Sequence, residues 1–178
     1  DDLFVNDQGE PVRIDKGFSW EHPLSAHGLM HNAITNAWRG DPYPIDTLMI
    51  FMANMAWNST MNTAQTQDML CAKDAGGGYK IPFIVVSDAF DSETVRFADL
   101  VLPDTTYLER FDTISILDRP ISEFEGPVDS VRVPVVEPTG DCKPFQEVLI
   151  ELASRLKFPA FTREDGTRKF KDYPDFIV

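Results

Sequence analysis

Cysteines are scarce in this sequence, and their scarcity limits the chemistry available to it. Only two are present among 178 residues, Cys71 and Cys142. An iron–sulfur cluster generally needs four thiolates, so this chain alone cannot build one. The wide separation of the two cysteines also excludes the close spacing of a zinc-binding pair. A disulfide between them stays open, although two cysteines do not make a disulfide-rich secreted scaffold.

Basic residues are outnumbered by acidic ones. The chain has 16 lysines and arginines against 29 aspartates and glutamates, which gives a formal net charge of −13. Binding to phosphate backbones needs clustered basic side chains, so the composition argues against nucleic acid as a partner. It argues equally against an anionic membrane surface. The acidity favours solubility, and contact with a basic partner or neighbouring domain is the alternative interpretation.

Long apolar runs and targeting signals are also missing. No run approaches the roughly 20 residues that span a bilayer, so we expect no direct membrane insertion. The opening DDLFVNDQGEPV is acidic and polar, unlike a signal peptide, and the absence of an initiator methionine suggests a segment of a longer protein. The compartment stays open between the bacterial cytoplasm and periplasm, and a membrane-associated complex is compatible with either.

Short apolar runs alternate with helical stretches in the middle of the chain. Runs at 47–52 and 82–86 have the length and composition of strands buried on both faces, and 99–103 is predicted to be a third short strand that ends at a proline. Helices are predicted between them, at 63–73 and 92–98. This alternation is typical of a parallel sheet with crossover helices. We therefore predict an α/β fold, namely a three-layer, Rossmann-like, open and mainly parallel sheet flanked by helices.

The two ends of the chain follow other patterns. One helix is expected near 28–38, and Pro144 precedes a second helix whose apolar residues recur at helical spacing to Leu156. Extended pieces are expected at 113–117 and 131–136. The predicted organisation has three parts: an irregular lead-in at 1–44, an α/β domain at 45–157, and a carboxyl-terminal tail at 158–178 that leads to a missing domain.

Polar residues follow the first two predicted strands, where open parallel sheets bind their ligands. Asn54 follows the first strand, and Ser87 and Asp88 close the second. The Asp88 carboxylate only accepts hydrogen bonds, which suits the paired N–H donors on the edge of a guanine. The alternative is that Asn54 and Asp88 are ordinary turn formers. The glycines at 76–78 precede a strand, so they predict a flexible turn and not a phosphate-binding loop.

Other potential sites are less well supported by the sequence. His27 and His31 would share a helical face, but no third ligand follows at the spacing that zinc sites prefer. We interpret them as two partly exposed histidines and predict no metal site. No Gly-x-Ser-x-Gly motif or acid–base pair is visible, so no catalytic residue is assigned.

One stretch resembles a known family. Residues 84–110, IVVSDAFDSETVRFADLVLPDTTYLER, are similar to the large catalytic subunits of the molybdopterin oxidoreductase family of dimethyl sulfoxide reductase type. There a strand ends at an aspartate, a short helix opens with Glu-Thr, and a second strand ends at Leu-Pro before a Thr-rich loop. Residues 46–62 resemble the family's preceding strand and polar loop, with Met55 in place of the usual proline. Residues 137–141 resemble its return segment, and the likeness covers 25–157.

The resemblance implies an α/β domain that holds the guanosine diphosphate arm of one of two molybdopterin guanine dinucleotides, with molybdenum or tungsten. The residues implied to contact the arm follow the three strands: Asn54, Trp57, Asn58 and Ser59 on the phosphate and ribose side, Ser87, Asp88 and Phe90 on the guanine side, and Asp104 and Thr105 after the third strand.

The resemblance also implies which parts of the enzyme lie outside this sequence. The family's iron–sulfur cysteines, its segment with the molybdenum ligand and its carboxyl-terminal domain are absent from this sequence, so the fragment alone is predicted to be inactive. Expected partners are the remaining domains of the same large subunit and an iron–sulfur electron-transfer subunit.

The whole enzyme would be a molybdenum-dependent oxidoreductase acting on a small sulfur or oxyanion substrate. The alternative is a non-catalytic binding or scaffolding module that kept the fold and lost the cofactor. A free-standing nucleotide-dependent dehydrogenase is disfavoured, because the Gly-rich fingerprint is missing.

Overall fold

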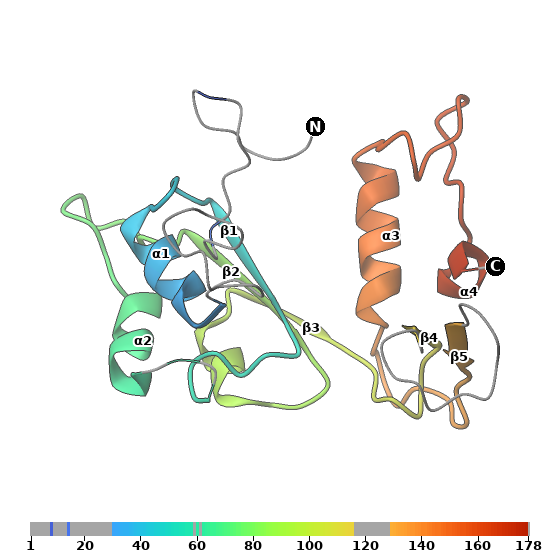
Figure 1. Cartoon of the computed structure of the whole chain (residues 1–178), viewed down its shortest axis with the longest axis horizontal. Coiled ribbons are helices and arrows are strands. Elements are labelled where there is room, and N and C mark those ends of the chain that lie inside the picture. Colours follow the sequence, from blue (N-terminus) through green and yellow to red (C-terminus); the bar gives the residue numbers. More distant parts are fainter. Residues whose placement is uncertain are drawn as a thin grey trace. The chain divides into compact units, whose positions relative to one another are not determined.

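The chain folds into two compact units, Asp1–Val101 and Leu102–Val178 (Figure 1). The computed structural model describes Gln8, Ile14 and residues 30–58, 60, 62–115 and 129–177. The division at 101/102 falls within the third strand, whereas the sequence predicted domain limits at 44/45 and 157/158. Those limits stay a prediction about the organisation of a longer polypeptide.

A three-stranded sheet forms the centre of the first unit. Its order is β1 (Thr47–Phe51), β2 (Phe83–Asp88) and β3 (Leu100–Pro103). β1 and β2 run parallel, with Thr47 opposite Phe83 at the start of the register. A parallel sheet flanked by helices confirms the predicted α/β fold, and the three strands lie where the apolar runs placed them.

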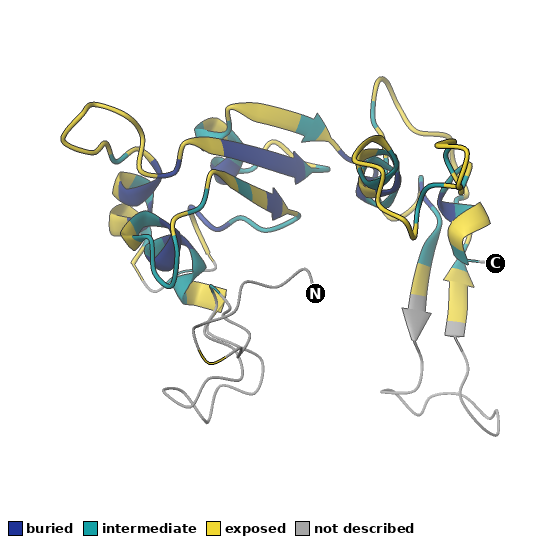
Figure 2. Ribbon diagram, turned by 90° about the horizontal axis from the view of Figure 1, so that it is seen from above, coloured by how far each residue is buried: buried dark blue, intermediate teal, exposed yellow. Residues whose placement is uncertain are grey.

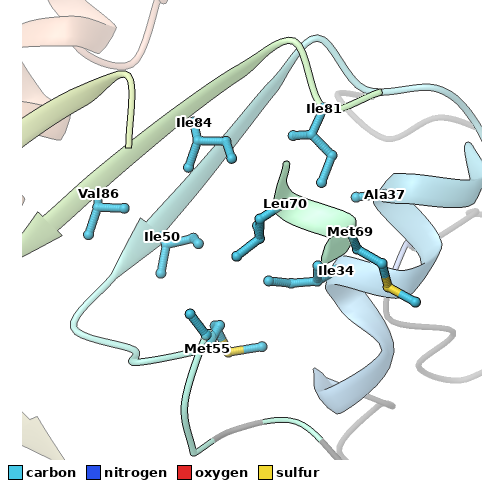
Figure 3. Packing of buried hydrophobic residues seen from close by; sticks show 10 residues of the cluster. Ile34, Ala37, Ile50, Met55, Met69, Leu70, Ile81, Ile84 and Val86 are labelled. Carbon is cyan, nitrogen blue, oxygen red and sulfur yellow. The ribbon is translucent and has the colours of Figure 1, made fainter. Parts of the chain in front are cut away.

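Two helices pack against one face of this sheet. A 3-10 turn at Met30–Asn32 leads into α1 (Ala33–Arg39), and α2 (Thr63–Leu70) follows β1. Figure 3 shows how side chains from both helices meet those of the strands. The buried apolar cluster consists of Ile34, Ala37, Ile50, Met55, Ala56, Met69, Leu70, Ile81, Ile84 and Val86.

The ends of the helices depart slightly from their predicted positions. Asn62 caps α2 by accepting a hydrogen bond from the Gln65 N–H at 3.2 Å. The helix ends at Leu70 and not at position 73, because Lys73 forms an isolated antiparallel bridge with Tyr79. The predicted helix at 92–98 is a 3-10 helix, η2 (Glu93–Phe97).

The two faces of the sheet differ in burial. Side chains alternate along a strand, so Ile50 faces the helices while Met49 and Phe51 point to the other face. Ile50 is buried, whereas Met49 and Phe51 remain 38% and 37% exposed. β2 is buried from Ile84 to Ser87 (Figure 2). The prediction of strands buried on both faces is therefore confirmed for most of β2 and wrong for β1.

The second unit contains a two-stranded antiparallel sheet and two helices. β4 (Asp112–Ser115) pairs with β5 (Asp129–Arg132), and α3 (Phe145–Arg155) and α4 (Tyr173–Ile177) follow. The helix predicted after Pro144 is confirmed, although Pro144 occupies the N-cap instead of the first helical position. Of the apolar residues that predicted this helix, Phe145 is buried, while the leucines at 149, 152 and 156 are exposed.

Candidate functional site

The carboxyl ends of β1 and β2 meet at one edge of the sheet. The Met52 N–H, just beyond β1, donates to the carbonyl of Ser87 in β2 at 2.9 Å. Met52 has a φ of +45°, a left-handed conformation that is costly for a residue with a side chain. This residue turns the chain away from the sheet and begins the loop that carries Asn54, Trp57 and Asn58.

The Asn54 side chain joins this loop to η2, which follows β2. Its Oδ1 accepts from the N–H of Thr94 at 3.2 Å and from the Thr94 hydroxyl at 2.8 Å. Its Nδ2 donates to the carboxylate of Glu93. The Thr94 hydroxyl in turn accepts from the N–H of Ala56 at 2.9 Å. Two loops that are far apart in sequence are thus tied together by side-chain hydrogen bonds.

α2 holds the same loop from another direction. Gln67 Nε2 donates to the Ala56 carbonyl at 3.1 Å, and the Thr63 hydroxyl donates to the Trp57 carbonyl at 3.0 Å. Met55 is buried in the apolar core. The indole of Trp57 nevertheless remains 57% exposed. The loop therefore presents a large aromatic ring to solvent from a backbone that is fixed on both sides.

The loop after β2 carries the second group of predicted residues. Asp88 Oδ1 accepts from the Phe90 N–H at 3.0 Å, and Oδ2 accepts from the Ser92 hydroxyl at 2.9 Å. A carboxylate has about four acceptor positions, so both oxygens keep capacity for a ligand. Phe90 is 70% exposed. Ser87 is fully buried, and its hydroxyl has no hydrogen-bond partner among the described residues.

The electrostatic character of this edge is acidic. The hydrogen bond from the Asn54 amide holds the pKa of Glu93 below its ordinary value, with smaller contributions from a backbone hydrogen bond and from Arg96. Glu93 therefore stays ionised near neutral pH, beside the carboxylates of Asp88 and Asp91. The loops at 52–62 and 88–92 contain no lysine or arginine.

Asp104 and Thr105 belong to the second unit and are deeply buried there. Asp104 Oδ1 accepts from the Thr105 N–H at 2.7 Å and from the Phe145 N–H at 3.2 Å, at the start of α3. Its Oδ2 accepts from Arg110 Nη1 at 3.1 Å, and both side chains are almost completely inaccessible. Arg110 also lies 3.7 Å from the Asp112 carboxylate. These contacts give Asp104 a structural role in this unit.

The predicted site residues thus fall into two groups, one in the first unit and the other, Asp104 and Thr105, in the second. The first unit brings Asn54, Trp57 and Asn58 close to the β2 loop through the Met52 and Thr94 hydrogen bonds, while Ser59 lies outside the described residues. None of the predicted contacts with a ligand is tested by this geometry, and they stay predictions. Sequence reasoning missed Glu93 and Thr94, which it interpreted only as the opening of a short helix.

The other candidates suggested by the sequence give no site in the part of the chain that the structure describes. No group of three or more histidine, cysteine or acidic side chains is arranged to hold a metal ion there, and His27 lies outside that part. Cys71 and Cys142 are both free thiols, the first exposed and the second partly buried. Within the same residues, no helix has the length and apolar character needed to cross a bilayer.

Comparison with known proteins places this architecture in a family. The family model for molybdopterin oxidoreductases matches residues 40–155. The chain is 73% identical over its whole length to a sulfite dehydrogenase subunit of Allochromatium vinosum. It is 32% identical, over 72% of its length, to the thiosulfate reductase molybdopterin-containing subunit PhsA of Salmonella typhimurium.

A solved structure agrees with these sequence matches. Acetylene hydratase from Pelobacter acetylenicus aligns with 88% of the chain at a TM-score of 0.60 and 25% identity. The chain spans only 18% of the sulfite dehydrogenase subunit, 15% of the thiosulfate reductase subunit and 19% of the hydratase, so each relative extends far beyond the matched segment. On these matches, the chain belongs to the molybdopterin oxidoreductase family, whose members carry a molybdenum or tungsten pterin cofactor.

Proposed function

We propose that this chain holds the guanosine diphosphate arm of one molybdopterin guanine dinucleotide within the large subunit of a molybdenum-dependent oxidoreductase. The observation that carries the proposal is the edge where β1 and β2 end. There the Asp88 carboxylate, with acceptor capacity left, adjoins the exposed ring of Phe90. An acceptor-only group beside an aromatic ring suits a base that offers two N–H donors and a flat face.

The residues at this edge fit the base and ribose end of such a group. The buried Ser87 hydroxyl lacks a hydrogen-bond partner among the described residues, and a buried polar group of this kind usually has one. A ribose or base atom would supply that partner, and the Trp57 indole offers a second aromatic surface on the neighbouring loop. When bound, the molybdenum cofactor supplies the redox chemistry, while these side chains bind and orient one arm.

The diphosphate needs positive charge that these loops do not provide. The loops at 52–62 and 88–92 contain no basic residue, and Asp88, Asp91 and Glu93 add negative charge. We therefore propose that cations or backbone N–H groups from other domains of the same large subunit complete the phosphate end. Those domains are the first partners of this chain, and an iron–sulfur electron-transfer subunit is the second.

The substrate class rests on the relatives and not on the fold. Two of the relatives are, by name, a sulfite dehydrogenase and a thiosulfate reductase. A hydratase shares the fold, so the fold does not decide the reaction. We propose a small sulfur oxyanion as substrate, because the 73% identity extends over the whole chain. Iron–sulfur clusters, if the enzyme uses them, are placed outside this chain.

The scaffolding alternative loses part of its support in this structure. It depended on the strongly acidic composition and on Met55 in place of the family's proline, which put the rigidity of the loop in doubt. Met55 is instead buried in the core, with neighbours that include Ile34 and Ile50. Its substitution thus has a packing explanation that does not require loss of the cofactor.

The test compares two Asp88 variants with a matched control in the full-length polypeptide. Losing a hydrogen bond to a charged group costs about 1.5–3 kcal/mol, which corresponds to a dissociation constant roughly 10- to 100-fold higher. We expect Asp88→Asn and Asp88→Ala to release the cofactor faster by about this factor. Asp91→Asn, which alters an exposed carboxylate of the same loop, should leave the release rate unchanged.

Two quantities are measured, molybdenum or tungsten per chain by elemental mass spectrometry and guanine nucleotide freed on denaturation. Asp88→Asn keeps the side-chain volume and an oxygen for the Phe90 N–H, so it separates ligand binding from loop collapse. Unchanged metal content and release rate in both Asp88 variants would contradict the assignment. A wild-type polypeptide without metal or guanine nucleotide would favour the scaffolding module.

A further inference from the structure

We propose that Thr94 and Glu93 are positioning residues, which hold the loop 54–58 through Asn54 in the shape that receives the cofactor arm. This inference rests on the proposed function, and it changes the role expected for Asn54. The sequence predicted that Asn54 contacts the arm directly. The geometry instead places its side chain between two protein loops.

The Thr94 hydroxyl makes two hydrogen bonds that an apolar side chain of the same shape cannot make. It donates to Asn54 Oδ1 at 2.8 Å and accepts from the Ala56 N–H at 2.9 Å. A hydroxyl has one proton and two lone pairs, so it can bridge a side chain and a backbone N–H at once. Thr94 is completely buried, and water cannot replace either bond without entering the core.

The hydrogen-bonding groups of Asn54 are used mainly within the protein. Oδ1 accepts two bonds from Thr94, and one proton of Nδ2 goes to Glu93. Its backbone carbonyl accepts from the N–H groups of Trp57 and Asn58 at 3.1 and 3.0 Å. A side-chain oxygen has two lone pairs, so Oδ1 has no acceptor position left for a ligand. Asn54 therefore organises the turn that carries Trp57, and its Oδ1 cannot also accept a hydrogen bond from the arm.

This network takes over the role that a proline at position 55 would have. Proline restricts φ and so stiffens a loop, whereas Met55 leaves the backbone free to rotate. Here the Ala56 N–H is held by Thr94, the Ala56 carbonyl by Gln67, and the Met55 side chain by the core. A loop ordered before binding loses less conformational entropy when the ligand arrives, and this strengthens binding without a new contact.

The test uses the full-length polypeptide with three threonine variants. Thr94→Val removes both bonds at nearly constant volume, and Thr94→Ser keeps the hydroxyl. Thr66→Val is the matched control, because the buried Thr66 hydroxyl donates to the carbonyl of Asn62, the N-cap residue of its own helix, at 2.9 Å. Amide hydrogen exchange at Ala56–Asn58 reports loop order, and guanine nucleotide release reports retention of the arm.

Losing a buried hydrogen bond costs about 1–3 kcal/mol, so Thr94→Val should raise both rates roughly tenfold or more. Thr94→Ser should return both rates to within about twofold of wild type, and Thr66→Val should change neither. Glu93→Gln, at a partly exposed position, should raise both rates less than Thr94→Val. The Glu93→Gln variant tests the same network if Thr94→Val does not fold.

Two results would overturn the inference while leaving the proposed function intact. The first is faster loop exchange with unchanged nucleotide release, since loop order would then be irrelevant to the arm. The second is faster release with unchanged exchange at Ala56, since Thr94 would then act by another route. A wild-type polypeptide that releases no guanine nucleotide would refute the proposed function itself, and this outcome is visible before any variant is made.

Discussion

Replacing Asp104 with alanine should destabilise the second unit by about 3–5 kcal/mol, the usual cost of removing one partner of a buried ion pair. The Asp104 side chain is inaccessible to solvent and its carboxylate lies 3.1 Å from Arg110 Nη1. Without Asp104, the buried guanidinium loses its nearest acidic partner among the described residues, and the Asp112 carboxylate lies farther away, at 3.7 Å. The variant also leaves the N–H groups of Thr105 and Phe145 without the oxygen they share.

The cost should be localised, which makes hydrogen exchange under native conditions the suitable assay. The Phe145 N–H begins α3, so protection of the α3 amides should fall together with that of the segment around Arg110. Amides of β1 and β2 in the first unit serve as an internal reference. Asp141→Ala, at an exposed aspartate of the same unit, is the matched control and should cost less than about 0.5 kcal/mol.

The Asp104→Asn variant separates the contribution of the negative charge to stability from that of the side-chain shape. When its oxygen accepts from the Thr105 and Phe145 N–H groups, its NH2 group is turned toward Arg110, so the charge–charge attraction is lost. We expect it to be less destabilising than alanine and still clearly worse than wild type. A loss below about 1 kcal/mol in Asp104→Ala would refute the reasoning, because removing one partner of a buried ion pair should cost several times that amount.

Two further predictions concern stability. Met55→Ala should cost about 2–4 kcal/mol, because it leaves a cavity in the core between the sheet and its helices, and exchange of the β2 amides should report it. Hydrogen bonds from Lys143 and Arg155 lower the pKa of Glu151 from 4.5 to about 2. The stabilisation from this group is therefore complete above pH 4.5 and is lost as the pH falls toward 2. Both cations are largely exposed, so the effect should not exceed about 1 kcal/mol, and Glu151→Gln should abolish it in acid titrations.

The strands could be predicted from sequence because hydrophobic runs of the right length alternated with helical stretches. The same runs could not show which faces would be covered. Met49 and Phe51 are as apolar as Ile50, yet only Ile50 meets α1 and α2 in the core. Helix ends were less predictable for a related reason. α2 stops at Leu70, and the bridge between Lys73 and Tyr79 that follows is a tertiary feature with no local signal.

The sequence predicts the candidate site from the position of residues at strand ends, and position alone does not give the role of a residue. Asn54 and Asp88 stand at strand ends, and that position is the same whether a residue binds a ligand or braces a loop. The hydrogen-bond partners of the Asn54 side chain lie 39 and 40 residues away, at Glu93 and Thr94, where no local pattern indicates them. Asp104 shows the same ambiguity, since only its burial against Arg110 reveals a structural function.

These contacts narrow the groups that remain available to select a ligand. Asn54 Oδ1 already accepts two hydrogen bonds, so on the proposed function selection at this edge would fall to Asp88, Ser87 and the exposed rings. A carboxylate can only accept, and guanine offers it two adjacent N–H donors, whereas adenine presents a ring nitrogen acceptor in the matching place. Pairing an acceptor with an acceptor leaves both without partners, which buried sites penalise heavily. The same carboxylate that binds guanine would therefore exclude adenine, and Asp88→Asn should weaken that preference because an amide both donates and accepts.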